Sequence, residues 1–136
     1  MKVQVRGATE AASNFERRAV RLPGALRSEA DHSMTYLKDR VPPYPPPLPL
    51  SRYSRTGTLG RNYYTDVKPL GAYSIVGVLG NRTEYAPVVI SSEVVGGLGP
   101  QAAVHAGRWF TLQEHLSTHS RQVMGFFTSA VRSAIT

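Results

Sequence analysis

The feature that most constrains this chain is a run of prolines in its first half. Six of the eight residues in Pro42–Pro49 are proline, within the stretch VPPYPPPLPL. Proline fixes φ at about −65° and has no backbone N–H, so such a run neither continues a helix nor joins the middle of a sheet. A basic stretch rich in glycine and hydroxyl residues, SRYSRTGTLGR, follows at once. Three uses fit this pattern: a ligand for a partner domain, a catalytic or phosphate-binding loop, or an arm used in assembly.

The composition limits the classes of protein to which the chain can belong. Its 136 residues suit a single domain over 1–136, and the absence of cysteine excludes disulfides and thiolate metal sites. The start, MKVQVRGATEAASNF, lacks the apolar run of a signal peptide, so we expect a soluble protein made in the cytoplasm. The net charge of +7 comes with 13 arginines and 3 lysines. Because arginine is favoured in interfaces and phosphate contacts, this bias permits nucleic-acid binding without proving it.

Apolar residues recur at helical spacing on both sides of the proline run. One stripe covers 8–22 and a second covers 23–40, and Pro23 between them predicts two N-terminal helices. Residues 112–135 carry the clearest stripe, which predicts a long C-terminal helix. We expect this helix to be anchored on a sheet by Leu116, Val123 and Phe127.

Strand-like segments occupy the start and the middle of the chain. MKVQV alternates in the manner of a short strand over 1–5, and three more candidates lie at 62–67, 72–79 and 83–90, with a hairpin connection at Asn81-Arg82. Together these elements predict an α+β fold. It has a small antiparallel sheet of three to four strands, packed with two N-terminal helices and one long C-terminal helix. An extended Pro-rich arm and turn over 42–60 and a mobile, glycine-rich loop over 91–108 complete the prediction.

Candidate catalytic chemistry is weak. His115 and His119 lie four residues apart on the predicted last helix, but no third ligand is evident, and two exposed histidines fit better than a metal site. The stretch RTGTLGR lacks the spacing of a P-loop, so a turn that leads into a strand fits better than nucleotide binding. The carboxylates are scattered. We therefore expect no enzyme, no metal and no cofactor.

Three stretches carry a family resemblance: SRYSRTGTLGRNYY, VGVLGNRTEYAPVV and HAGRWFTLQEHL. Together, and in this order, they resemble the small neck or tail-completion proteins of long-tailed double-stranded DNA bacteriophages. In that family an Arg-Thr-Gly-x-Leu turn precedes a strand pair that leads to Tyr-Ala. The matching residues here are Arg55-Thr56-Gly57-Thr58-Leu59 and Tyr85-Ala86, and His105, Arg108 and Trp109 resemble a family variant. The chain departs from the family after Pro87, where VVISSEVVGGLG replaces the usual Tyr-x-Glu-x-Gly.

The resemblance implies a virion structural protein of the neck, present in the host cytoplasm during assembly. Such proteins form rings at the head–tail junction, commonly of six copies. Their partners are a portal-side connector, tail terminator or tail tube proteins, and the genomic DNA in the channel, which is bound without sequence specificity; no membrane is involved. The alternative is a small basic nucleic-acid-binding module, which would show tight binding that falls steeply with salt.

Six residues of the proline-rich arm and the turn are candidate contact residues. Tyr44, Leu48 and Leu50 are apolar side chains that a free loop would leave in water, which suggests contacts with a subunit or partner. Arg55, inside the turn motif, is expected to pair with a carboxylate of an adjoining subunit. Arg52 and Arg61 are better placed to face DNA or solvent.

Overall fold

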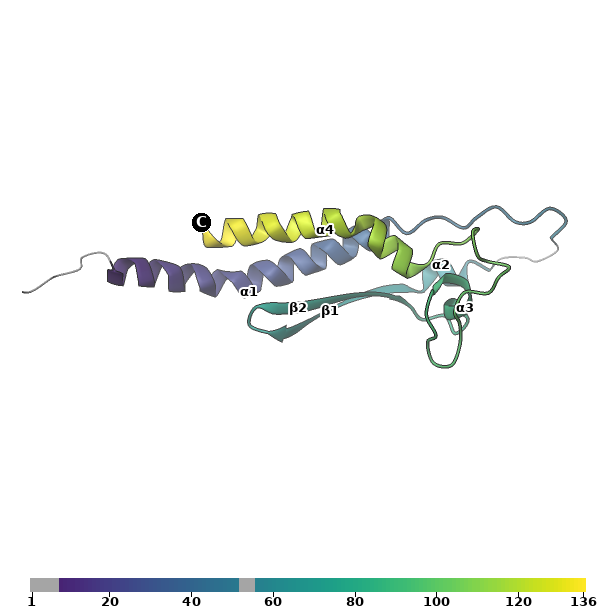
Figure 1. Ribbon diagram of the computed structural model, residues 1–136, viewed down its shortest axis with the longest axis horizontal. Helices are drawn as coiled ribbons and strands as arrows, with labels where there is room; N and C mark the ends of the chain where they lie inside the picture. The colour runs from purple at the N-terminus through teal and green to yellow at the C-terminus, as the bar shows by residue number, and fades with distance from the viewer. Residues whose placement is uncertain (1–7, 52–55) are drawn as a thin grey trace, which may run out of the picture.

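The protein is elongated (Figure 1). The computed structural model describes residues 8–51 and 56–136. Two long helices and a β-hairpin form a rod, and two short helices with their loops form a smaller globular end. No helix in the described ranges has both the length and the apolar character needed to cross a membrane.

Helix α1 spans Ala8–Asp39 as one uninterrupted element. The predicted division into two helices at Pro23 is therefore wrong, although Pro23 does lie inside the helix. A proline in this place removes one backbone donor and crowds the carbonyl one turn earlier, which costs about 3 kcal/mol in an isolated helix. The C-terminal helix and the hairpin both pack along α1, and this tertiary burial outweighs the local penalty.

The predicted C-terminal helix is confirmed as α4, which spans Leu112–Ile135. It begins at a capping box made by Thr111 and Glu114. The Thr111 hydroxyl accepts a hydrogen bond from the Glu114 N–H at 3.1 Å, and the Glu114 carboxylate accepts one from the Thr111 N–H at 3.3 Å. Because these bonds satisfy donors that the first turn of a helix leaves free, the sequence TLQE fixes where α4 starts.

The main contact of α4 is with α1 and not with the sheet (Figure 1). The prediction that Leu116, Val123 and Phe127 anchor α4 on the sheet is wrong in this respect, and Leu116 is 54% exposed. The ring of Phe126 instead meets the ring of Tyr36 edge to face, with centroids 5.1 Å apart. Helix α1 therefore separates α4 from the sheet over most of the rod.

A histidine joins the start of α4 to the end of α1. His115, expected to be exposed, is buried. Its Nε2 donates to the Leu37 carbonyl oxygen at 2.8 Å, and this carbonyl, in the last turn of α1, also accepts a hydrogen bond from the Arg40 N–H at 3.3 Å. Burial, followed by the nearby His115 and Arg40, lowers the pKa of the neighbouring His119.

We expect His115→Phe to lower the free energy of unfolding by about 1 kcal/mol, because the ring is kept while the hydrogen bond to Leu37 is lost. Denaturant titration followed by circular dichroism measures the change. The control is Gln122→Ala, since Gln122 is exposed on the same helix and its substitution should change stability by less than about 0.5 kcal/mol. Equal losses from the two substitutions would show that the bond to Leu37 adds nothing of its own.

The sheet is an antiparallel hairpin. Strand β1 spans Tyr63–Gly71 and β2 spans Ser74–Asn81, with the first residue of β1 opposite the last residue of β2. Helix α1 covers one face of this hairpin. A Cβ at Gly77 would come within 2.8 Å of the Met34 side chain, so the glycine allows α1 to approach the sheet closely.

The described residues contain two paired strands, so the predicted sheet of three to four strands is wrong for this part of the chain. The predicted strand over 1–5 lies outside the described residues. The segment 83–90, predicted as a strand, forms a turn followed by helix α3, Ala86–Ile90. Pro87 lies in the first turn of α3, where a missing N–H costs no intrahelical bond. The hairpin turn lies at Ala72-Tyr73 and not at Asn81-Arg82.

The globular end has its own small core. Helix α2, Thr58–Arg61, and helix α3 supply the four residues of this core, Leu59, Ala86, Val89 and Ile90. Residues 41–51 contain no helix or strand and run from the end of α1 to the far end of the molecule (Figure 1). Residues 91–108 form a series of turns, including a tight one at Gly96-Gly97 where Val95 and Leu98 pair.

Candidate functional site

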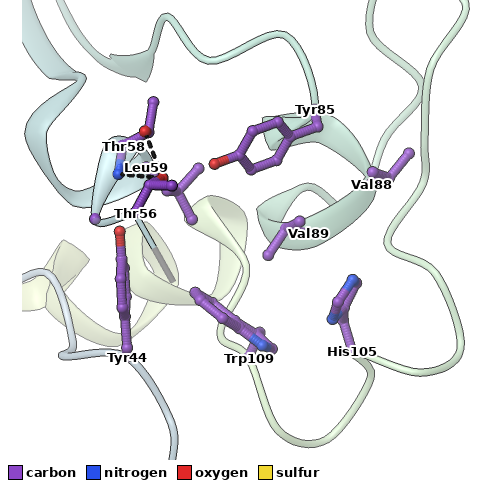
Figure 2. Close-up of a pocket in the computed structure, with 10 residues that line it drawn as sticks. Tyr44, Thr56, Thr58, Leu59, Tyr85, Val88, Val89, His105 and Trp109 are labelled. Carbon is purple, nitrogen blue, oxygen red and sulfur yellow. Dashed lines mark hydrogen bonds between the residues drawn. The ribbon is translucent and has the colours of Figure 1, made fainter. Parts of the chain in front are cut away.

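The sequence motifs that carry the family resemblance meet at the globular end. The turn residues Thr56–Leu59, together with Tyr85, His105 and Trp109, line one cavity of about 390 Å³ (Figure 2). Tyr44 from the proline-rich segment closes one side of it. We call this set of residues the motif cluster. Segments that lie far apart in the sequence thus form a single structural unit.

The conformation of the turn explains its glycine. Gly57 has φ of 72°, in the left-handed region that side chains with a Cβ rarely adopt. A Cβ there would also lie 2.9 Å from the guanidinium of Arg61. That guanidinium donates to the Thr56 carbonyl oxygen at 2.9 Å, and the hydroxyls of Thr56 and Thr58 lie 2.6 Å apart. Arg61 therefore closes the turn within its own chain.

Two motif residues are structural. Leu59 is 3% exposed and Ala86 is 5% exposed, and both belong to the core of the globular end. The Leu59 carbonyl accepts a hydrogen bond from the Asn81 side-chain amide at 2.7 Å, which ties the turn to the end of β2. In these two positions the motif specifies packing and the course of the backbone.

Tyr44 fastens the proline-rich segment to the motif cluster. Its hydroxyl oxygen accepts a hydrogen bond from the Gly60 N–H at 2.6 Å, and its ring centroid lies 5.2 Å from that of Trp109. Further along, the Arg108 guanidinium donates to the Pro46 carbonyl oxygen at 2.8 Å. The first part of the segment is therefore held on the body of the protein by two residues of the third motif, Arg108 and Trp109.

His105 contributes a polar atom to a mostly apolar lining. Its ring packs edge to face against Trp109, with centroids 6.1 Å apart. Its Nδ1 is buried and has no hydrogen-bond partner among the described residues. Among the described residues, no carboxylate, lysine or arginine lines the cavity, and no group of three or more His, Cys, Asp or Glu side chains could hold a metal ion. The mostly apolar lining suits an apolar or aromatic group.

The predicted contact residues do not all lie together. Tyr44 belongs to the motif cluster, whereas Leu48 and Leu50, which are 48% and 100% exposed, lie beyond it near the end of the described part of the segment. Arg61 is exposed beside the turn. Arg52 and Arg55 lie outside the described residues.

Sequence reasoning missed several polar residues that hold the globular end together. The Gln101 side-chain amide donates to the Val89 and Trp109 carbonyl oxygens at 2.6 and 3.1 Å. Asn62 donates to the Thr83 hydroxyl at 3.2 Å. Only the position of Asn62 and Gln101 in the sequence could have indicated this role. Amide side chains in loops and beside strand ends often form hydrogen bonds with backbone groups that have no other partner.

Comparison of the chain with protein-family models finds no match. Comparison with curated proteins and with solved structures also finds none.

We expect Tyr44→Phe to lower the free energy of unfolding by about 1–2 kcal/mol, because the Gly60 N–H loses its acceptor while the ring contact with Trp109 stays. Amide exchange at Gly60 should rise at the same time. Tyr73→Phe is the control, since Tyr73 lies on the hairpin turn and is 62% exposed. Unchanged exchange at Gly60 in Tyr44→Phe would refute the anchoring role.

Proposed function

We propose that this protein is a virion structural protein of the neck of a long-tailed double-stranded DNA bacteriophage. Copies of the chain would form a ring, of six in the family that the sequence resembles, that completes the tail and joins it to the head connector. DNA would pass through the channel. The sequence resemblance supports this proposal, and so does the meeting of its motifs in one cluster.

The observation that carries the proposal is the amount of surface that the single chain exposes. Its accessible surface is 9787 Å². A folded monomer of 14.9 kDa is expected to expose about 7,000 Å². The excess of about 2,800 Å² exceeds the ~800 Å² that one partner contributes to a standard interface. This elongated shape leaves room for contacts with neighbouring chains, which supports the proposal (Figure 1).

Much of the exposed surface is apolar. Phe15 and Val20 on α1 are 71% and 78% exposed, and Leu70 near the hairpin turn is 68% exposed. Phe15 lines a second hollow with Tyr73 and Ile135, where the first half of α1, the hairpin turn and the end of α4 come together. Contact with neighbouring subunits would bury such side chains, and each Å² of apolar surface buried would stabilise the assembly by about 25 cal/mol.

The proline-rich segment is the proposed arm. Leu50 is fully exposed and has φ of 63°, a conformation that costs a residue with a Cβ about 1–2 kcal/mol. The Ser51 N–H donates to the Leu48 carbonyl oxygen at 3.0 Å, which closes the turn that presents Leu50. Together with Tyr44, these leucines form the proposed contact with a subunit or partner. Arg55 would pair between subunits, and Arg52 and Arg61 would face DNA.

The mass of the purified protein tests the ring. Light scattering after size exclusion should give a closed oligomer, about 89 kDa if six copies of the 14.9 kDa chain assemble. Negative-stain images of the same fraction should show rings with an open centre. A monomer at every concentration, or an oligomer without a channel, would refute the proposal.

A basic nucleic-acid-binding module is the second candidate. Among the described residues, Lys68 with Asp66 is the one ion pair between a lysine or arginine and a carboxylate, so most of the positive charge in this part of the chain is not neutralised by ion pairs. Titration with duplex DNA separates the two candidates. A module should bind tightly and lose about 10³-fold or more in affinity between about 50 and 200 mM salt. A ring subunit should bind free DNA weakly throughout.

We expect Leu50→Asn to block assembly into particles without destabilising the chain. Asparagine adopts the left-handed conformation more readily than leucine, so the free energy of unfolding should stay equal or rise by up to about 1 kcal/mol. Thermal melts and incorporation into particles are the two measurements. Val94→Asn, which changes another well-exposed apolar side chain, serves as the control and should assemble normally. Normal incorporation of Leu50→Asn would show that the arm makes no contact through this residue.

A further inference from the structure

The backbone of the hairpin has two unpaired edges. In an antiparallel pair the N–H and C=O of one residue point to the same side, and successive residues alternate. The Arg82 N–H donates to the Asn62 carbonyl, which continues the β1–β2 register and shows that even-numbered residues pair inward. The backbone groups of Ile75, Gly77 and Leu79 on β2 therefore point outward. They form no backbone hydrogen bond with any described residue.

The outer edge of β2 lacks the features that keep strand edges from pairing. Its sequence, SIVGVLGN, has no charge and no proline. Natural sheets protect an open edge with charged residues, prolines or bulges. Strand β1 has all three near its end, in the Asp66–Lys68 ion pair, Pro69 and an irregularity after Pro69. Its outward groups at Tyr63, Thr65 and Val67 precede Pro69 and remain able to pair.

A hollow lies beside β2 on the face that α1 covers. It measures about 230 Å³ and lies between the strand and the start of α4. Its lining is mostly apolar and includes Leu79 and Gly77 from β2, Met34 from α1 and Leu116 from α4. When a strand adds to a sheet edge, its main chain bonds to that edge and alternate side chains enter such hollows. An apolar side chain that entered this hollow would also contact Leu116, which is otherwise exposed.

We propose that the outer edge of β2 pairs, antiparallel, with the outer edge of β1 of a second copy of this chain. The inference rests on the proposed ring, and it names the contact that joins one subunit to the next. Pairing of two different edges is heterologous, so it can continue around a ring, whereas β2 paired with β2 would close after two copies. The side chain of Thr65 or Val67 from the second copy would enter the hollow beside β2.

Disulfide trapping tests this pairing, because the chain has no cysteine of its own. Asp66 on β1, and Val76 and Val78 on β2, have side chains on the sheet face away from α1, and all lie outside the motif cluster. These even-numbered residues would be non-hydrogen-bonded neighbours across the new contact, where Cα atoms lie about 4.5 Å apart. Chains carrying D66C are mixed with differently tagged chains carrying V76C or V78C and oxidised.

The expected result is a disulfide-linked pair of unlike tags with V76C or V78C, and no dimer of D66C alone. Links found only between like β2 variants would indicate a two-fold β2–β2 contact and overturn the proposal. If the wild type has the mass of a ring but no disulfide-linked pair forms, the proposed strand pairing is wrong and the proposed ring is not contradicted. A monomeric wild type would overturn both.

A second variant tests the backbone contact directly. Thr65→Pro removes an outward N–H of β1 and leaves the inward bonds to β2 in place. Thr65→Val keeps this N–H and is the matched control. Light scattering should show loss of the assembled species in Thr65→Pro but not in Thr65→Val, with similar melting curves. Full assembly of a folded Thr65→Pro protein would overturn the proposal.

Discussion

The rod depends on the packing of the second half of α1 between two other elements. This part of the helix is covered by α4 on one side and by the hairpin on another, and its buried residues Ala30, Met34 and Leu37 supply most of the apolar interior of the rod. Ser33, which has no exposed surface, is small enough to let its neighbours approach closely. A two-stranded hairpin is at best marginally stable alone, so its order depends on the face of α1 that it covers.

The globular end is held together in a different way from the rod. Its core is small, and much of its order comes from side-chain hydrogen bonds to backbone groups in turns, such as those made by Asn81, Gln101 and Tyr44. Such bonds fix direction more than they add stability, since each contributes about 1 kcal/mol net. The motif cluster therefore sets where the proline-rich segment leaves the body. The rod, in contrast, gains its stability from burial between long elements.

The sequence predicts the parts of this fold that are locally determined. The capping box at Thr111 and the long apolar stripe locate α4, and the strand candidates at 62–67 and 72–79 locate the two strands to within a few residues. The sequence does not predict the elements whose conformation depends on contacts with residues far away in the chain. Packing along α1 overrides the local effect of Pro23, and the short apolar run at 86–90 fits a strand and a helix equally well until its neighbours are known.

The candidate site is predictable only in part, for a related reason. The resemblance identified the turn, Tyr85-Ala86 and the segment ending at Trp109, but no local pattern shows that they meet. The buried position of Leu59 and the left-handed conformation of Gly57 give these motif residues a structural role that the spacing alone did not reveal. The partners of Tyr44 were also unpredictable, because they depend on how residues 41–51 return to the body.

The positive charge of the chain affects the stability of the proposed ring. The arginines of the described residues bond mainly to carbonyl oxygens and aromatic rings, as Arg61, Arg108 and Arg40 do, and the chain carries a net charge of +7. A ring of six such chains would carry a charge of about +42, and its subunits would repel one another. Acidic surfaces of neighbouring neck proteins, or DNA phosphates in the channel, would reduce that repulsion. The ring should therefore be more stable in place, between its partners and around DNA, than alone at low ionic strength.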